Sequence, residues 1–478
     1  MTLFIRKSKC FHQKKCITNS VSISRNFKIS ILLFFVLLLS IIGYSQKQWS
    51  LTDCINYAIE NNIEIKQSEI NTATNKINLQ QSKLDLIPSL NASASHSYGW
   101  GRSLDFATYT YSNQTTQQNY FQISSNVTIF QGFQKYNSIK QNNFEYLASQ
   151  FDSDMMRDNI SVRLAFAYLQ ILYSQEILDV AVNQLDITNQ QIERTQKLVN
   201  AGTLAKGSLL EIQSQGAQEE VNVIMAQNNL NLAYLDLLQL LDLAASEKFE
   251  IVKPELDITE QPQLLKPQEV YSYAVMNRPQ ILGAEYRVKS SDRELAIAKG
   301  LRSPSLQLNA GWNTRYSNRE MQTKTVGKDT ITSVVPFGDQ FSDFQDKSLS
   351  LSLNIPIFNG FQVSSNINRA KLNIRRAENS LELEKNTLRK TIEQSYNDAT
   401  SAYKSYNATV KSVNSFQEAF KYTEQKFNVG MVNAVDYNLS KSRLVKAESE
   451  LLQAKYDFVF KRKILDFYMG IPLEFLKK

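Results

Sequence analysis

Residues 129–134 read IFQGFQ and residues 357–362 read IFNGFQ, so this 478-residue chain carries nearly the same hexapeptide twice. Each copy places a glycine between two phenylalanines, and the copies lie 228 positions apart. The similarity extends upstream, where NYAIENN at 56–62 matches SYAVMNR at 272–278 with a shift of 216. Matches at several places along the chain indicate a duplicated unit rather than a chance hexapeptide.

Downstream of the hexapeptides the shift stays at 228, because LVNAGT at 198–203 matches KFNVGM at 426–431. The two shifts differ by 12, so one insertion of 12 residues between the two regions explains both. We therefore predict two copies of one structural unit, joined by a linker that contains prolines. The predicted first unit is 46–252, the linker is 253–267 and the second unit is 268–478.

Four segments alternate between apolar and neutral polar residues, as strands with one apolar face do. The clearest is SLSLSLNIPIF, in which leucines and isoleucines alternate with serine, asparagine and proline. A proline, Pro88 or Pro304, precedes the first strand of each unit. The predicted strands are about 89–100, 120–130, 305–313 and 348–358.

The length of these strands suits a tilted strand that crosses a bilayer, which needs about 9 to 11 residues. A strand of a soluble sandwich alternates in the same way. Four strands cannot close a barrel, which needs about eight, and an open edge in lipid leaves backbone groups unsatisfied. If the strands cross a membrane, several chains must combine them. The outward loops would then be 99–120 and 313–347, beside an aromatic belt of Trp100, Tyr98, Trp312 and Tyr316.

Long helices are predicted for most of the remaining sequence. Each unit contains 68 residues without glycine or proline, from Gln134 to Ala201 and from Gln362 to Val429, enough for a rod of about 100 Å. Each rod stops at a glycine, and a second amphipathic stretch follows, which predicts an antiparallel helical hairpin. A solvated coiled coil has the same composition. The predicted helices are 134–201, 206–243, 362–429 and 432–469, with a shorter helix at the start of each unit.

The first 45 residues have the pattern of a signal peptide. They carry seven Lys or Arg and no Asp or Glu, and they end in the apolar run ISILLFFVLLLSIIG at 29–43. That run has 15 residues, whereas a helix that spans a membrane needs about 20, so a cleaved signal is favoured over a membrane anchor. We predict that 1–45 is removed near Ser45 and Gln46.

Composition excludes several classes of protein. Seven of the 53 Lys and Arg lie in the signal segment, which leaves 46 against 46 Asp and Glu, so no basic surplus indicates nucleic acid. The predicted mature chain keeps one cysteine, Cys54, and one histidine, His96, too few for a disulfide, a zinc site or a histidine-dependent nucleophile. No phosphate-binding glycine motif is present. We expect no enzymatic activity and no cofactor.

The signal peptide, the duplication, the pre-strand prolines, the glycine after the second strand and the long helices occur in one order. In that order the chain resembles the TolC-like outer membrane efflux protein family. The resemblance implies a mainly α fold with a small β part, in which antiparallel helical hairpins form a periplasmic tunnel. It also implies four transmembrane strands in each chain, which a homotrimer combines into a 12-stranded barrel.

The same resemblance implies a location and partners. The protein would lie in the outer membrane of a Gram-negative bacterium, in contact with lipid, and would bind a periplasmic adaptor protein and an inner-membrane pump of the RND or ABC type. It would be a passive duct for efflux or secretion. A secreted helical coiled-coil scaffold or adhesin is the alternative, and the sequence does not distinguish small-molecule efflux from protein secretion.

Residues of the hairpin tips carry part of the resemblance. Gly202 and Gly430 occupy the two turns, and with Val429 and Met431 they form the tip that would dock on the adaptor. Gly132 and Gly360 in the repeated hexapeptides are interpreted as joints between strand and helix.

One acidic residue of the second tip matches a family position that narrows the tunnel entrance. That residue is Asp436, whereas Leu439 stands at the next such position. In the first unit Ser208 stands where Asp436 predicts an acid, and Glu211 lies one turn further on. Our hypothesis is that Asp436 and Glu211 form an acidic constriction, and the alternative is that both are ordinary solvated residues.

Overall fold

The computed structural model describes residues 48–105, 109–244, 249–254, 258, 264–327 and 329–473. The predicted signal segment lies outside the described residues, and the predicted linker is described only in part. Nearly all of the described residues belong to one compact unit, Trp49–Glu247 with Ile251–Lys478, and the following account concerns that unit.

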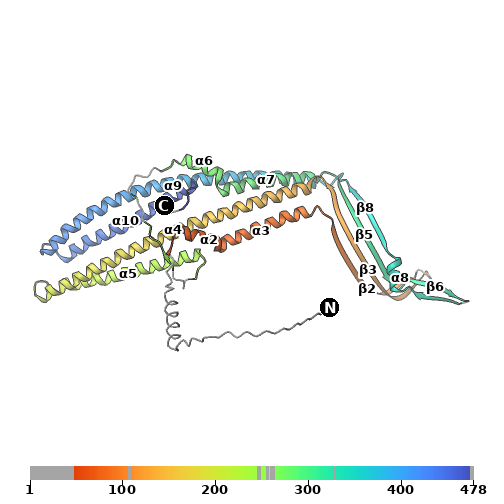
Figure 1. The fold of residues 1–478 in the computed structure, drawn as a ribbon, viewed down its shortest axis with the longest axis horizontal. Coiled ribbons are helices and arrows are strands. Elements are labelled where there is room, and N and C mark those ends of the chain that lie inside the picture. The colour runs from red at the N-terminus through yellow and green to blue at the C-terminus, as the bar shows by residue number, and fades with distance from the viewer. Residues whose placement is uncertain are drawn as a thin grey trace, which may run out of the picture. The chain divides into compact units, whose positions relative to one another are not determined.

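The elements occur in the same order in each half of the chain (Figure 1). The paired helices α2 and α6 have 11 residues each, α3 and α7 have 22, α4 and α9 have 67, and α5 and α10 have 35. The helices of the described chain are α2 Leu51–Asn61, α3 Ile63–Leu84, α4 Gln134–Asn200, α5 Lys206–Leu240, α6 Pro267–Asn277, α7 Pro279–Gly300, α8 Phe337–Asp343, α9 Gln362–Asn428 and α10 Ala434–Tyr468. Its strands are β1 Gln48–Trp49, β2 Ser89–Asp105, β3 Thr110–Gln131, β4 Glu250–Ile251, β5 Ser305–Ser317, β6 Met321–Val326, β7 Asp329–Val334 and β8 Asp346–Asn354.

Local sequence explains where the short helices begin. Ser50 and Asp53 form a capping box at the start of α2, which satisfies two backbone N–H groups that the helix leaves free. The Asn62 side chain accepts from the Glu64 backbone N–H and donates to the Leu240 carbonyl, so it caps α3 and ties it to the end of α5. Helices α6 and α7 each begin with a proline, whose missing N–H costs nothing in the first turn.

Four antiparallel strands form the main sheet, in the order β2-β3-β5-β8. Residues that pair directly across strands share a face. One face therefore joins Leu351 of β8 to Leu308 of β5, and Leu308 to Val127 of β3. The alternate residues of these strands, mostly serine, asparagine and glutamine, lie on the other face.

The strands differ in extent from those predicted. Strands β2 and β3 continue through most of 99–120, which was predicted to be a loop, because threonine, tyrosine and glutamine there extend the antiparallel ladder without an apolar face. Strand β5 also continues to Ser317. Strand β8 ends at Asn354 rather than 358, since Pro356 cannot donate to a ladder.

The second predicted loop, 313–347, is also structured. It contains the β6–β7 hairpin and α8, a seven-residue helix that packs on β5. Gln340 of α8 is fully buried, and its side chain donates to the Ser317 and Val335 carbonyls while it accepts from the Ser317 N–H. The rings of Phe341 and Phe337 pack on Trp312 and Tyr316, so α8 covers half of the predicted aromatic belt.

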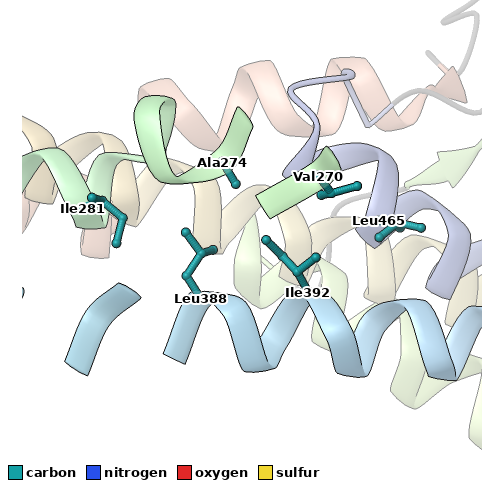
Figure 2. Close-up of a cluster of buried hydrophobic side chains, with 6 residues drawn as sticks. All are labelled: Val270, Ala274, Ile281, Leu388, Ile392 and Leu465. Carbon is teal, nitrogen blue, oxygen red and sulfur yellow. The ribbon is translucent and has the colours of Figure 1, made fainter. Parts of the chain in front are cut away.

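The long helices pack in pairs (Figure 1). Helix α4 packs against α5, and α9 packs against α10, while α7 lies against both α4 and α9. Figure 2 shows a buried aliphatic cluster where four helices meet, with residues from α6, α7, α9 and α10. Its members are Val270, Ala274, Ile281, Leu388, Ile392 and Leu465. Among the described residues, no helix carries an apolar stretch long enough to cross a membrane.

A two-residue left-handed joint links strand to helix in each half. Gly132 and Phe133 have φ of 57° and 58°, and Gly360 and Phe361 have φ of 59° and 61°. The two phenylalanines of each hexapeptide pack edge to face, with centroids 5.5 Å apart for Phe130 and Phe133. Glycine adopts this conformation without strain, whereas phenylalanine does not, so the aromatic contact must offset that cost.

The joint at Gly132 is also tightly packed, and this predicts a large effect of one methyl group. A Cβ at Gly132 would lie 2.4 Å from the Gly300 carbonyl oxygen, whereas a Cβ at Gly202, which also has positive φ, would meet nothing within 4 Å. We expect Gly202→Ala to cost about 1 kcal/mol from backbone strain alone. Gly132→Ala should cost about 2–4 kcal/mol, because overpacking adds to the strain. Urea unfolding of the detergent-purified protein, followed by circular dichroism, measures both; equal costs would contradict the packed joint.

Candidate functional site: the tips of the two hairpins

The first tip turns at Gly202, which has φ of 74°. The Gly202 N–H donates to the Val199 carbonyl at 3.0 Å, and the Thr203 N–H donates to the Leu198 carbonyl at 3.0 Å. This pair of bonds is a Schellman motif, which satisfies carbonyls that the end of α4 leaves free. The Thr203 hydroxyl adds a bond to the Leu198 carbonyl at 2.8 Å.

The second tip repeats this geometry around Gly430, which has φ of 77°. The Gly430 N–H donates to the Phe427 carbonyl at 3.1 Å, and the Met431 N–H donates to the Lys426 carbonyl at 2.9 Å. Both predicted glycines therefore sit at left-handed positions that end a 67-residue helix.

The second tip presents exposed apolar side chains. Val429 is 70% exposed and Met431 is 73% exposed, and they flank the turn glycine. The corresponding flanks of the first tip are Ala201 and Thr203, which offer little apolar area. Only one of the two tips therefore offers a flexible apolar contact such as methionine provides.

Asp436 lies in the first turn of α10 and is exposed. The Asn433 side chain caps the helix there, accepting from the Asp436 backbone N–H at 2.8 Å, so the backbone that carries this carboxylate is fixed. Glu211 is also exposed, on α5. Within the described chain no hydrogen bond or ion pair joins these two carboxylates, so one copy of the chain does not bring them together. Leu439 is exposed as well.

The residue after Asp436 points the other way. Tyr437 is fully buried and stacks on Phe427, with ring centroids 4.6 Å apart, and it also packs against Phe420. Burial raises the pKa of Tyr437 to about 12, and the charge of Glu424 adds to this effect. The ring cluster therefore fixes the start of α10 against the end of α9 while Asp436 faces solvent.

A buried polar cluster links the two hairpins just behind the tips. Lys441 of α10 is 4% exposed, and its Nζ donates to the Thr188 hydroxyl of α4 at 2.8 Å. That hydroxyl also contacts the carboxylate of Glu219 on α5. The Glu219 carboxylate accepts from Gln184 at 3.2 Å and from Gln215 at 3.0 Å. Thr188 thus bridges a buried cation and a buried anion.

Burial dominates the electrostatics of this cluster. It lowers the pKa of Lys441, while the carboxylates of Glu219 and Glu424 oppose that effect by favouring the charged ammonium. Nearer the tips, the Arg194 guanidinium of α4 donates to the Asn428 side chain of α9 at 2.7 Å. The two hairpins are therefore joined by polar contacts at two levels.

Sequence reasoning did not identify Glu219 or Lys441. The available signal was the heptad spacing of the buried residues on α5. Glu219 occupies one of these positions, so a charge there indicates a buried partner. That stripe includes Leu209, Ile212, Gly216, Glu219, Ala226, Leu230, Ala233 and Leu237.

Comparisons with known proteins agree with this architecture. The family model described as outer membrane efflux protein matches two stretches, 54–242 and 270–470, one in each half. Outer membrane protein TolC of Escherichia coli (strain K12) is 26% identical over 322 residues, which cover 63% of this chain and 59% of that protein. Outer membrane efflux protein BepC of Brucella suis biovar 1 (strain 1330) is 21% identical over 424 residues, which cover 87% of this chain and 84% of that protein.

A solved structure shows the same fold. The crystal structure of CusC superposes with a TM-score of 0.71 at 16% sequence identity, and the match covers 90% of this chain and 96% of that chain. The chain spans only about three fifths of the length of the Escherichia coli relative, since the aligned part is 59% of it.

The buried cluster predicts energetic coupling between Lys441 and Glu219. Lys441→Met and Glu219→Met should each cost about 2–4 kcal/mol, because each leaves the other charge buried without its counterpart. The double variant should cost less than the two together, by about 1 kcal/mol or more. Thermal unfolding in detergent measures the cycle.

The exposed pair Lys446 and Glu450, 4.0 Å apart on the same helix, is the matched control. Its coupling should be about 0.5 kcal/mol or less. Additive effects of Lys441→Met and Glu219→Met would show that the buried pair is not coupled.

Proposed function

Because the chain belongs to the outer membrane efflux protein family, we propose that it is the outer-membrane duct of an export system, built from three copies. The resemblance found in the sequence is thus confirmed, and the protein is an outer membrane protein with a large periplasmic part. The duct itself would be passive, and its helices would carry material across the periplasm.

The apolar face of the sheet is the observation that supports this proposal best. Strand β8 is exposed on both faces, and its leucines lie on the same face as those of β5. In water a continuous exposed face of this kind is unfavourable, whereas in a bilayer it replaces lipid contacts at no cost and the polar face lines an aqueous interior. The exposed members include Leu90, Ile123, Leu349, Leu351 and Leu353.

The sheet supports assembly of several copies. Its two end strands, β2 and β8, have no partner on their outer edges among the described strands. An open edge in hydrocarbon leaves backbone N–H and C=O groups unsatisfied. Three copies of the four-stranded sheet supply 12 strands, more than the minimum of about eight that a barrel needs.

The helical part supports a long conduit. Helices α4 and α9 have 67 residues each, which corresponds to about 100 Å. We place the adaptor on the second tip, at Val429 and Met431, since these are its exposed apolar side chains. The adaptor would connect the duct to an RND or ABC pump in the inner membrane, which would supply the energy and select the substrate.

Conductance and assembly test the proposed duct. The protein extracted from outer membranes with detergent should behave as a trimer and should form ion-conducting channels in a planar bilayer. A soluble monomer without conductance would overturn the duct and would favour a secreted scaffold or adhesin instead.

Asp436 provides a test of the acidic constriction. If three Asp436 carboxylates ring the entrance, Asp436→Asn should lower the cation-to-anion permeability ratio by roughly twofold or more, because charged rings set selectivity. Glu211→Gln should have the same direction of effect. Glu378→Gln, an exposed acid in the middle of α9, is the matched control and should change nothing. An unchanged ratio in the Asp436 variant would place the constriction elsewhere.

A further inference from the structure

The two halves of the chain meet through one pair of strands. Strand β3 belongs to the first half and β5 to the second, and they pair antiparallel in the middle of the sheet. By the duplication, β8 corresponds to β3, and β2 corresponds to β5. The outer edges of β8 and β2 therefore correspond to the two edges that pair in the middle of the sheet.

The two sequence shifts hold residue by residue in the structure. Ser89 pairs with Asn126, and adding 216 and 228 to these numbers gives Ser305 and Asn354, which also pair. The same operation maps every pair of β5 with β8 onto a pair of β2 with β3. The two hairpins thus have one register, and the shifts relate equivalent positions in three dimensions.

We propose that β8 of one copy pairs with β2 of the next copy, antiparallel, in the register obtained by applying these shifts to the pairing of β3 with β5. The inference rests on the proposed function, which needs copies side by side. Ile123 pairs with Trp312 within the chain, so Leu351 pairs with His96 of the next copy. Gln122 pairs with Asn313, so Ser350 pairs with Ser97 of the next copy.

The faces of the strands agree with this register. Leu351 lies on the apolar face through its pairing with Leu308. His96 lies on the same face, because Asn119, its partner, is two residues from Phe121 on β3. A slip of one residue would set the leucines of β8 on the face of the β2 serines. The derived register therefore keeps one continuous apolar face across the junction.

The helices give independent support. Within the chain, Tyr286 of α7 packs on Phe144 of α4, with ring centroids 6.1 Å apart. The equivalent positions at the junction are Ile70 of α3 and Leu372 of α9, which are 57% and 59% exposed. The operation that pairs the strands thus brings two exposed aliphatic side chains together, although they were not used to derive it. Burial of both against each other is favourable.

The junction differs from the internal contact in two respects. Arg287 forms an ion pair with Asp152 inside the chain, whereas the equivalent positions are Asn71 and Ser380, so the junction lacks this charge pair. In addition, Leu84 stands at the position of Gly300, whose backbone touches the Gly132 joint. The corner between helix and strand is therefore not copied, and the inference covers the strands and the contact of Ile70 with Leu372.

Disulfide crosslinking in outer membranes tests the register. The pairs Leu351→Cys with His96→Cys and Ser350→Cys with Ser97→Cys sample adjacent ladder positions, one on each face. Oxidation should give reductant-sensitive dimers and trimers on denaturing gels, since directly opposed residues lie about 4.5–5.5 Å apart at Cα. Cys54 is fully buried and its pKa is raised to about 12, so it stays in place as an unreactive thiol.

Two variants shifted by two residues are the matched controls, because they keep the face but change the register. Leu351→Cys with Ala94→Cys, and Leu351→Cys with Tyr98→Cys, should give at least tenfold less crosslinked product. The in-chain pair Val127→Cys with Leu308→Cys checks the oxidation, since these residues oppose each other in one copy.

The outcomes separate the register from the duct. Crosslinking in a shifted pair, or in no pair while trimers and conductance persist, overturns the register and leaves the proposed function standing. Loss of the proposed function would appear instead as cysteine-free protein that neither assembles nor conducts.

Discussion

The need to pair every strand edge is the constraint on which this structure depends. Backbone N–H and C=O groups at an open edge have no partner in hydrocarbon, so a four-stranded sheet in a bilayer is stable only if its ends meet other strands. Strands β3 and β5 meet inside the chain, while β2 and β8 await partners. Because each strand continues into a helix, closing the sheet also sets the long helices side by side.

The joints convert one backbone period into another. A strand repeats every two residues and a helix every 3.6, and the turn between them must redirect the chain without leaving space. At Gly132 two successive left-handed residues make this turn, and Phe130 packs on Phe133 across it. The Gly300 backbone fills the space beside the glycine, so the joint also fixes the first half of the chain to the second.

Features with a periodic or conformational signal could be predicted from the sequence, and those that depend on distant contacts could not. The turns at Gly202 and Gly430 follow from 68 residues without a helix breaker. Helix α8 gave no signal because it has seven residues and is held by Gln340, whose partners lie on other segments. The outward ends of β2 and β3 lack an apolar face, so alternation could not reveal them.

The polar cluster behind the tips follows from the composition of the hairpins. Their seam uses small residues such as Ala226 and Ala447, which bury little apolar area, so sliding one helix by a heptad would cost little. A buried Lys441 finds the Thr188 hydroxyl and the Glu219 carboxylate in only one register. Charges at core positions lower stability but penalise every other alignment. In helices that present wide polar surfaces to water, this penalty fixes the register that a larger apolar seam would otherwise set.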